Sequence, residues 1–235
     1  MSLPKPAGGY LKVAHRGASA LAPENSLAAV EAALAAAVDI VELDVLAVDG
    51  GLRLAHSRGQ LQPDSPKLDD ALELFARTAP PRMWLDLDVK IPGHEDGIMG
   101  AVAAHDLLER TLVTSFHLQV LRATKRLQPG IATGIAYPND RHGLSERRPF
   151  GALVGPGLRV LRAALPARIG RMLAAAGADA AMLHHALVTP KVVTGCRTAG
   201  AAVFAWTIET RDDLERVLAA GADGAIANDP SLFDE

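Results

Sequence analysis

The chain has 235 residues, of which 49% are hydrophobic, so it contains enough apolar material to bury a large core. The formal net charge of −3 gives no overall attraction for nucleic acids or anionic membranes, and no run approaches the roughly 18 apolar residues of a transmembrane helix. With no secretory signal pattern at the start and one cysteine, Cys196, which excludes an internal disulfide, we expect a cytoplasmic protein that acts on a small molecule.

Short apolar runs typical of buried strands recur along the chain, separated by longer stretches with the spacing of amphipathic helices. The predicted strands are 12–15, 40–45, 52–56, 83–90, 111–116, 131–137, 180–184, 202–208 and 224–227. The predicted helices are 26–37, 68–77, 97–108, 118–127, 158–176, 190–199 and 211–219. Asn25 and Ser26 offer side-chain caps for the first helix, and Gly177, Gly200 and Gly221 end later ones.

Eight principal strands alternate with helices, and the run 52–56 adds one more strand. This arrangement predicts a (β/α)₈ TIM barrel, for which about 250 residues is usual, with an open doubly wound sheet as the alternative. No Pro/Gly/Ser-rich linker or change in composition divides the chain. We therefore expect a single domain over residues 1–235.

Carboxylates lie at the ends of two predicted strands. Glu42 and Asp44 are two residues apart and so point to the same side of a strand, and Asp86 and Asp88 repeat this spacing on the next. The strand ends of a barrel meet at one mouth, where Glu42, Asp44 and Asp88 would form an oxygen-rich site for one Mg²⁺ or Ca²⁺ ion. The alternative is that these acids form ion pairs with basic residues, namely Arg16, Arg53 and Lys90.

Two histidines end predicted strands at the same mouth. His15 and His56 are the groups there with an ordinary pKa near neutrality, so one can accept a proton while the other donates one. Arg16 offers a planar guanidinium to a phosphate group, and Lys90 offers a second positive charge. These residues predict an acid/base reaction on a phosphate-containing substrate.

Short motifs along the whole chain resemble those of the glycerophosphodiester phosphodiesterase family. They are His15-Arg16-Gly17, Pro23-Glu24-Asn25, Glu42-Leu43-Asp44, His56-Ser57, Leu87-Asp88-Val89-Lys90, Ser115-Phe116, Trp206-Thr207 and Asp223-Gly224. Each motif is short, but the set occurs in the family's order over nearly the whole chain.

The resemblance implies a TIM barrel that hydrolyses glycerophosphodiesters to sn-glycerol 3-phosphate and an alcohol with one divalent cation. His15 and His56 would be the acid/base pair, and Arg16 and Lys90 would contact the phosphate. The metal ligands would be Glu42, Asp44 and Asp88. Glu24 and Asn25 would lie in the first loop of the substrate site; for Asn25, capping of the following helix is an equally good account. Trp206 would form a wall of the pocket or pack in the core.

Three departures from the family pattern concern the mouth. Ser57 replaces the usual Asp after the second histidine, and Asp88 replaces the usual Glu. Only residues 57–67 separate His56 from the next helix, where the family commonly inserts a small capping subdomain. We expect most of that insertion to be missing and the mouth to be more open.

The sequence is also compatible with two alternative functions. The short loop is similar to that of sphingomyelinase D-like relatives, which cleave choline phospholipids in a phospholipase D-like reaction, and the missing acid after His56 would also suit an idle barrel that only binds phosphorylated ligands. The segment 138–171 bears on the first alternative because it carries seven arginines among apolar residues: Arg141, Arg147, Arg148, Arg159, Arg162, Arg168 and Arg171. It could be a phosphate-facing lid or make weak contact with a membrane surface, but a solvated helix face is the favoured reading.

Overall fold

The computed structural model describes residues 3–4, 9–49, 51–138 and 151–234. Its strands are β1 (Leu11–Ala14), β2 (Ile40–Val48), β3 (Gly51–Leu54), β4 (Trp84–Val89), β5 (Thr111–Ser115), β6 (Ala132–Tyr137), β7 (Ala180–His184), β8 (Ala202–Ile208) and β9 (Gly224–Ala227). Its α-helices are α1 (Leu27–Ala35), α2 (Leu68–Thr78), α3 (Glu95–Ala104), α4 (Leu118–Leu127), α5 (Gly151–Ala164), α6 (Ile169–Ala176), α7 (Pro190–Thr198) and α8 (Arg211–Ala219). Short 3-10 helices are η1 (Leu108–Arg110), η2 (Leu165–Ala167), η3 (His185–Leu187) and η4 (Pro230–Phe233).

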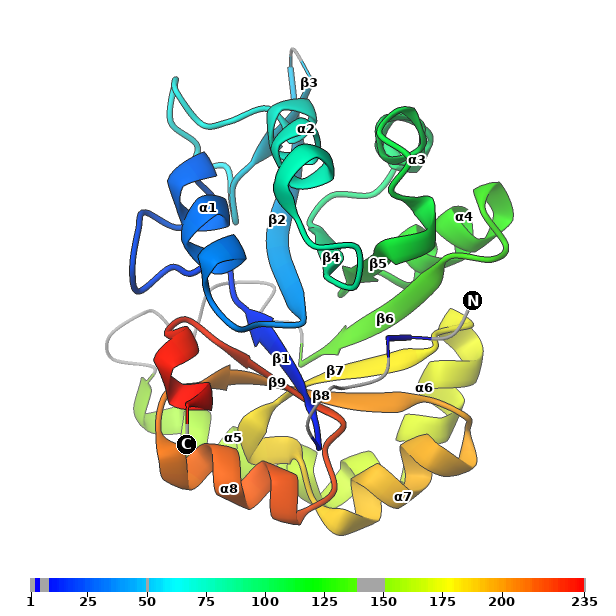
Figure 1. The fold of residues 1–235 in the computed structure, drawn as a ribbon. Helices are drawn as coiled ribbons and strands as arrows, with labels where there is room; N and C mark the ends of the chain where they lie inside the picture. Colours follow the sequence, from blue (N-terminus) through cyan, green and yellow to red (C-terminus); the bar gives the residue numbers. More distant parts are fainter. Residues whose placement is uncertain (1–2, 5–8, 50, 139–150, 235) are drawn as a thin grey trace.

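The sheet closes on itself because β1 has a parallel partner on each side. Val13 of β1 is paired with Ile40 of β2 and with Ile226 of β9. From β9 the order continues through β8, β7, β6, β5 and β4 back to β2, and β3 pairs antiparallel with β2 outside the barrel. The helices surround this closed ring of strands (Figure 1). The predicted (β/α)₈ TIM barrel is therefore confirmed.

Two apolar layers hold the barrel together. Side chains that alternate along the strands fill the interior, where Phe204 is fully buried, and the outward-facing residues pack against the helices. Gly224 is required next to Phe204, because a Cβ atom there would lie 2.4 Å from the Phe204 ring. Leu72 and Phe75 of α2 show the outer layer, since both are completely buried against the barrel.

Local sequence explains most helix ends, with one correction. Ser26 caps α1 by accepting a hydrogen bond from the Ala29 backbone, and Gly177 ends α6 in the left-handed conformation, as predicted. The prediction of one continuous helix over 158–176 is wrong. Pro166 lies in the 3-10 turn between α5 and α6, and proline has no N–H to continue an α-helix.

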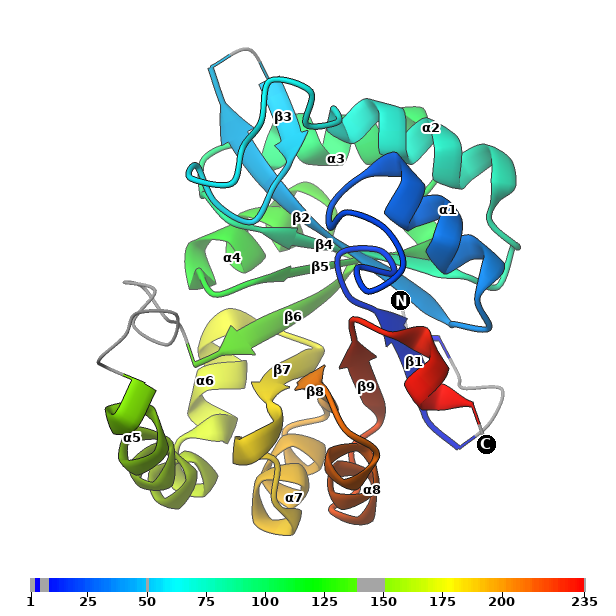
Figure 2. The same ribbon diagram turned by 90° about the vertical axis from the view of Figure 1, so that its left-hand side faces the viewer.

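The strands β3 and β4 end slightly earlier than predicted, whereas β2 continues to Val48, beyond the predicted residue 45. β3 ends at Leu54 and β4 at Val89, so His56 and Lys90 lie just beyond their strands. The connection 55–67 from β3 to α2 contains no helix or strand of its own, which confirms that most of the capping insertion is missing. Figure 2 shows β2 and β3 extending beyond the rest of the barrel, next to this connection.

The arginine-rich segment is described only in part. Arg141, Arg147 and Arg148 lie outside the described residues. The described arginines of the segment are all exposed on or beside α5 and α6: Arg159, Arg162, Arg168 and Arg171. Throughout the described part of the chain, no helix combines the length and the apolar character needed to cross a bilayer.

Candidate active site

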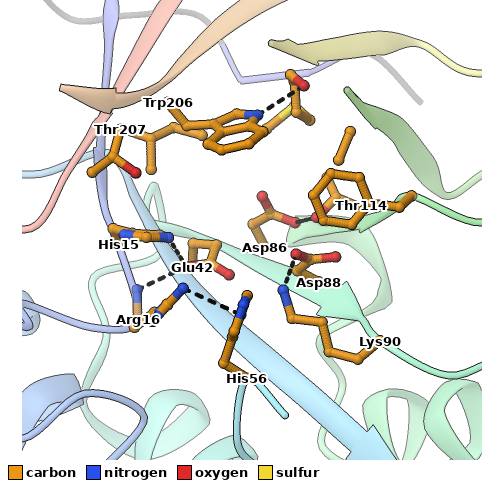
Figure 3. Close-up of a pocket in the computed structure, with 14 residues that line it drawn as sticks. His15, Arg16, Glu42, His56, Asp86, Asp88, Lys90, Thr114, Trp206 and Thr207 are labelled. Atoms are coloured by element: carbon orange, nitrogen blue, oxygen red, sulfur yellow. Dashed lines mark hydrogen bonds and ion pairs between the residues drawn. The ribbon is translucent and has the colours of Figure 1, made fainter. Parts of the chain in front are cut away.

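A cavity opens where the carboxyl ends of the strands converge (Figure 3). The predicted site residues that line it are His15, Arg16, Glu42, His56, Asp88, Lys90 and Trp206. They come from β2, β4 and β8 and from the segments that follow β1, β3 and β4, so barrel closure brings together residues far apart in the sequence. The expectation that these residues gather at one end of the strands is confirmed.

The turn after β1 has a backbone shape that few residues adopt. Arg16 and Gly17 have φ angles of 54° and 77°, and a Cβ atom on Gly17 would lie 2.6 Å from the backbone carbon of Ala29 in α1. This turn directs two backbone N–H groups at Glu42: Arg16 N donates to Oε2 at 2.7 Å, and Gly17 N donates to the carbonyl oxygen at 2.9 Å. The turn therefore fixes the Glu42 carboxylate in the mouth.

Asp44 is buried among hydrogen-bond donors. Its Oδ2 atom accepts from Asn25 Nδ2 at 2.8 Å and lies 3.1 Å from Arg16 Nε and 3.3 Å from His56 Nδ1. Burial by itself would raise the pKa of the Asp44 carboxyl, but the ammonium group of Lys90, with His56 and Arg16, holds that pKa well below its usual range. Asp44 is therefore a fixed negative charge between β2 and the loops.

Lys90 joins the carboxylates of two strands. Its Nζ atom lies 2.5 Å from Asp44 Oδ1 and also donates to Asp88 Oδ2. Burial would lower the pKa of Lys90, but Asp44, Asp88 and Glu42 together raise it above its ordinary value. Lys90 therefore stays charged at the mouth, 5.8 Å from the centre of the Phe116 ring.

Three carboxylates at the mouth are arranged in a way that suits a metal ion. Glu42, Asp44 and Asp88 each offer an oxygen within 4.8 Å of the others. Burial, followed by the nearby Asp44 charge, raises the pKa of Glu42 well above its usual value, so the positive charges nearby do not fully compensate Glu42. Asp88 Oδ1 is buried without a hydrogen-bond partner among the described residues. An oxygen-rich, negatively charged donor set of this kind fits a divalent cation.

The two predicted catalytic histidines have different surroundings. His15 Nδ1 lies 2.6 Å from Asn228 Oδ1, and its Nε2 lies 3.9 Å from Glu42 Oε2. Burial, with Arg16 as the next cause, lowers the pKa of His15 to about 4. His56 Nδ1 instead has both Asp44 Oδ2 and a terminal nitrogen of Arg16, at 3.2 Å, within reach. The mouth thus holds two imidazoles close to one acidic cluster (Figure 3).

Glu24 and Trp206 occupy different places. Glu24 is not among the described residues that line the cavity; its Oε2 accepts from Arg16 at 2.6 Å, and its Oε1 accepts from Gln60 at 3.1 Å. Trp206 lines the cavity, with its ring edge-to-face against Phe116 at 6.1 Å and its Nε1 donating to the Met182 carbonyl oxygen at 2.9 Å. Glu24 therefore holds Arg16, and Trp206 forms a wall.

Several residues at the site were not predicted in their observed roles. Of the two readings of Asn25, capping of α1 is wrong, because Ser26 is the cap and Asn25 binds Asp44. The cavity is also lined by Asp86, Thr114, Phe116 and Thr207, and Asn228 contacts His15. One sequence signal was available for Asn228, since it is two residues beyond Ile226 and so on the inward-facing side of β9.

The sequence of this chain is similar to those of known proteins. The family model for the glycerophosphoryl diester phosphodiesterase family matches residues 15–58 and 93–232. A glycerophosphodiester phosphodiesterase of Caldanaerobacter subterraneus is 28% identical over 259 residues, which cover 95% of this chain and 96% of the relative.

Solved structures share the fold. A putative glycerophosphoryl diester phosphodiesterase of Silicibacter pomeroyi superposes with a TM-score of 0.77 at 21% identity, covering 98% of this chain and 94% of that one. An Oleispira antarctica phosphodiesterase in complex with its product sn-glycerol 3-phosphate superposes with a TM-score of 0.70 at 22% identity, covering 99% and 98%. On the match of its family model, this chain belongs to the glycerophosphoryl diester phosphodiesterase family.

Proposed function

We propose that the protein hydrolyses glycerophosphodiesters to sn-glycerol 3-phosphate and an alcohol, using two histidines and one divalent cation. The observation that carries this proposal is the meeting of His15 and His56 with buried carboxylates and with the cations Arg16 and Lys90 in one cavity. Family membership supports it, as does the complex of the Oleispira antarctica enzyme with sn-glycerol 3-phosphate.

His15 and His56 carry the proton transfers. One imidazole takes a proton from the attacking water as the new P–O bond forms, and the other gives a proton to the alkoxide as the old P–O bond breaks. The His15 ring lies near Glu42 and the His56 ring lies near Asp44. The positive charge that each ring gains as an imidazolium is therefore balanced by a nearby carboxylate.

Arg16 and Lys90 stabilise negative charge on the phosphoryl oxygens that do not react. Both side chains are held before substrate binds, Arg16 by Glu24 and Asp44, and Lys90 by Asp44 and Asp88. Cations fixed in this way need little reorganisation during the reaction. Trp206 walls the cavity and excludes water from one side.

Three residues would hold the metal: Glu42, Asp44 and Asp88. We propose Mg²⁺ or Ca²⁺, because both prefer carboxylate oxygens. When bound, the cation supplies positive charge that polarises a phosphoryl oxygen. Asn25 and the Arg16 backbone N–H hold two of these carboxylates in place through hydrogen bonds.

The direct test is ³¹P NMR of the protein with glycerophosphocholine and, separately, with lysophosphatidylcholine, each with Mg²⁺, Ca²⁺ or EDTA. We expect glycerol 3-phosphate from glycerophosphocholine, and we expect EDTA to abolish it. The second substrate is included because the short connection 55–67 leaves the mouth without a capping subdomain. Lysophosphatidic acid or a cyclic phosphate from that substrate alone would instead favour a phospholipase D-like reaction, and no product from either would favour an idle binding barrel.

The roles of the histidines are tested by His15→Ala and His56→Ala. Each should lower kcat by roughly 10²–10⁴-fold, the usual effect of losing a general acid or base. His105→Ala is the matched control, since His105 pairs with Asp69 outside the mouth and the variant should retain wild-type activity. Near-full activity in both folded mouth variants would contradict the assignment.

A further inference from the structure

The orientation of His15 depends on contacts between the segments that follow the first strand, β1, and the last strand, β9. His15 follows β1, and its backbone N donates to the Ala227 carbonyl oxygen of β9 at 2.9 Å. Asn228 follows Ala227, and its own carbonyl oxygen accepts from Ala20 N at 3.0 Å. Both main chains are therefore fixed, and the two side chains meet between neighbouring parallel strands.

The contact between the side chains is short and polar. Asn228 Oδ1 lies 2.6 Å from His15 Nδ1, a distance that fits an N–H···O hydrogen bond. An amide oxygen only accepts, so the ring nitrogen that faces it must carry the proton. The other ring nitrogen, Nε2, lies 3.9 Å from Glu42 Oε2, beyond hydrogen-bond distance. Glu42 therefore does not compete for the proton of the ring.

His56 offers an instructive contrast. Its Nδ1 atom has a carboxylate oxygen of Asp44 at 3.3 Å and a guanidinium nitrogen of Arg16 at 3.2 Å, so an acceptor and a donor face the same nitrogen. These contacts allow either tautomer of His56. At His15, among the described residues, the only hydrogen-bond partner of the ring is Asn228.

We propose that Asn228 is a positioning residue that keeps the His15 proton on Nδ1 in both the neutral and the charged ring. The proton that His15 exchanges with substrate is then always exchanged at Nε2, the nitrogen on the Glu42 side of the ring. This inference rests on the proposed function, in which His15 transfers a proton. It does not depend on whether His15 acts first as the acid or as the base.

The tautomer is measured directly by long-range ¹H–¹⁵N NMR of the imidazoles, with the His15 signals identified by their loss in His15→Gln. We expect the Nδ1–H form in the wild type and in Asn228→Asp, because a carboxylate also accepts from Nδ1–H. We expect a mixture of tautomers in Asn228→Ala. If the amide instead donated through Nδ2, the wild type would show the Nε2–H form and Asn228→Asp would reverse it.

Kinetics on glycerophosphocholine give the second readout. Asn228→Ala should lower kcat about 10–100-fold with little change in KM, the usual effect of removing a partner that orients a functional histidine, and Asn228→Asp should restore most of kcat. Asp229→Ala is the matched control, because Asp229 caps η4 through Ser231 N and does not contact His15.

The two proposals can fail separately. If the wild type turns over no glycerophosphodiester, the proposed function fails, while the NMR spectrum still reports the tautomer. A wild-type ring with its proton on Nε2 would overturn the role of Asn228, and that result needs no variant to fold. An Asn228→Ala variant with an unchanged tautomer and unchanged kcat would overturn it as well.

Discussion

Asn25 binds Asp44 at both ends of its amide. Its Nδ2 donates to Asp44 Oδ2 at 2.8 Å, and its Oδ1 accepts from the Asp44 backbone N–H at 3.0 Å. Asn25 is buried and has a φ angle of 56°, a conformation that asparagine tolerates better than most residues. The loop after β1 thereby fixes the side chain and the backbone of a carboxylate on β2.

Replacing Asn25 should destabilise the fold as well as the site. In Asn25→Ala, a buried N–H and a carboxylate oxygen lose their partner, so we expect the free energy of unfolding to fall by about 1–3 kcal/mol. Asn25→Asp should be at least as harmful, because it places a second carboxylate against Asp44. Urea denaturation measures both. Ser26→Ala is the comparison: it removes the α1 cap and the hydrogen bond from Ser26 Oγ to the Pro23 carbonyl oxygen, with an expected loss of about 1 kcal/mol. A wild-type stability for Asn25→Ala would contradict this reading.

A second prediction concerns Gly17. Gly17→Ala introduces a side chain at a φ of 77° and pushes its Cβ to within 2.6 Å of the Ala29 backbone. Gly177→Ala is a matched control, since its φ is 64° but nothing lies within 4 Å of the added atom. The control should lose about 1–2 kcal/mol from backbone conformation, and Gly17→Ala should lose a further ~1–3 kcal/mol from the clash. Equal losses in denaturant titrations would show that α1 moves away freely.

Metal binding should be visible without any substrate. A cation that binds the folded chain stabilises it by about 2.7 kcal/mol at one hundred times its Kd, so Tm should rise with added Mg²⁺ or Ca²⁺ and fall back with EDTA. Glu42→Gln should remove most of the rise, because it deletes one of the three clustered carboxylates. Glu109→Gln, an exposed change on η1, should leave it intact. An equal rise in both variants would place the cation elsewhere.

The free energy of unfolding should depend on pH partly through the lowered pKa of His184. This ring lies edge-to-face against Trp206, and burial, with neighbouring His185 as the next cause, lowers its pKa to about 4. Between pH 6.5 and 4 the unfolded chain binds a proton there that the folded chain does not, so the free energy of unfolding falls as the pH falls through this range. His184→Gln should make that decline shallower in urea titrations from pH 7.5 to 4.5. The exposed His94→Gln serves as control, and a decline in His184→Gln as steep as in the wild type would contradict the prediction.

Local patterns predicted most of the barrel, because buried parallel strands are continuous apolar runs separated by amphipathic helices. The strands 180–184, 202–208 and 224–227 agree with β7, β8 and β9 residue for residue. The prediction was wrong at helix 158–176, where the apolar spacing continues through Pro166 although the hydrogen bonding of the helix does not. The spacing of apolar residues indicates which face of a helix is buried. An interruption of the helix that keeps the same face buried leaves this spacing almost unchanged.

The site was predictable where spacing alone decides which side a residue faces. Glu42 and Asp44 share a face at any register, so their meeting could be inferred from β2 itself. The partner of each side chain could not be inferred in this way. Asn25 binds across 19 residues and Asn228 across 213, and such contacts depend on how loops fold and on how the barrel closes.

The contact of His15 with Asn228 depends on the part of the barrel that is synthesised last. β9 follows every other strand of the barrel in the chain, and it supplies both the backbone partner of His15 and the amide that faces its ring. A chain that lacks β9 and the residues after it has neither of these partners and cannot close the ring of strands. Both contacts of His15 therefore form only when β9 closes the barrel.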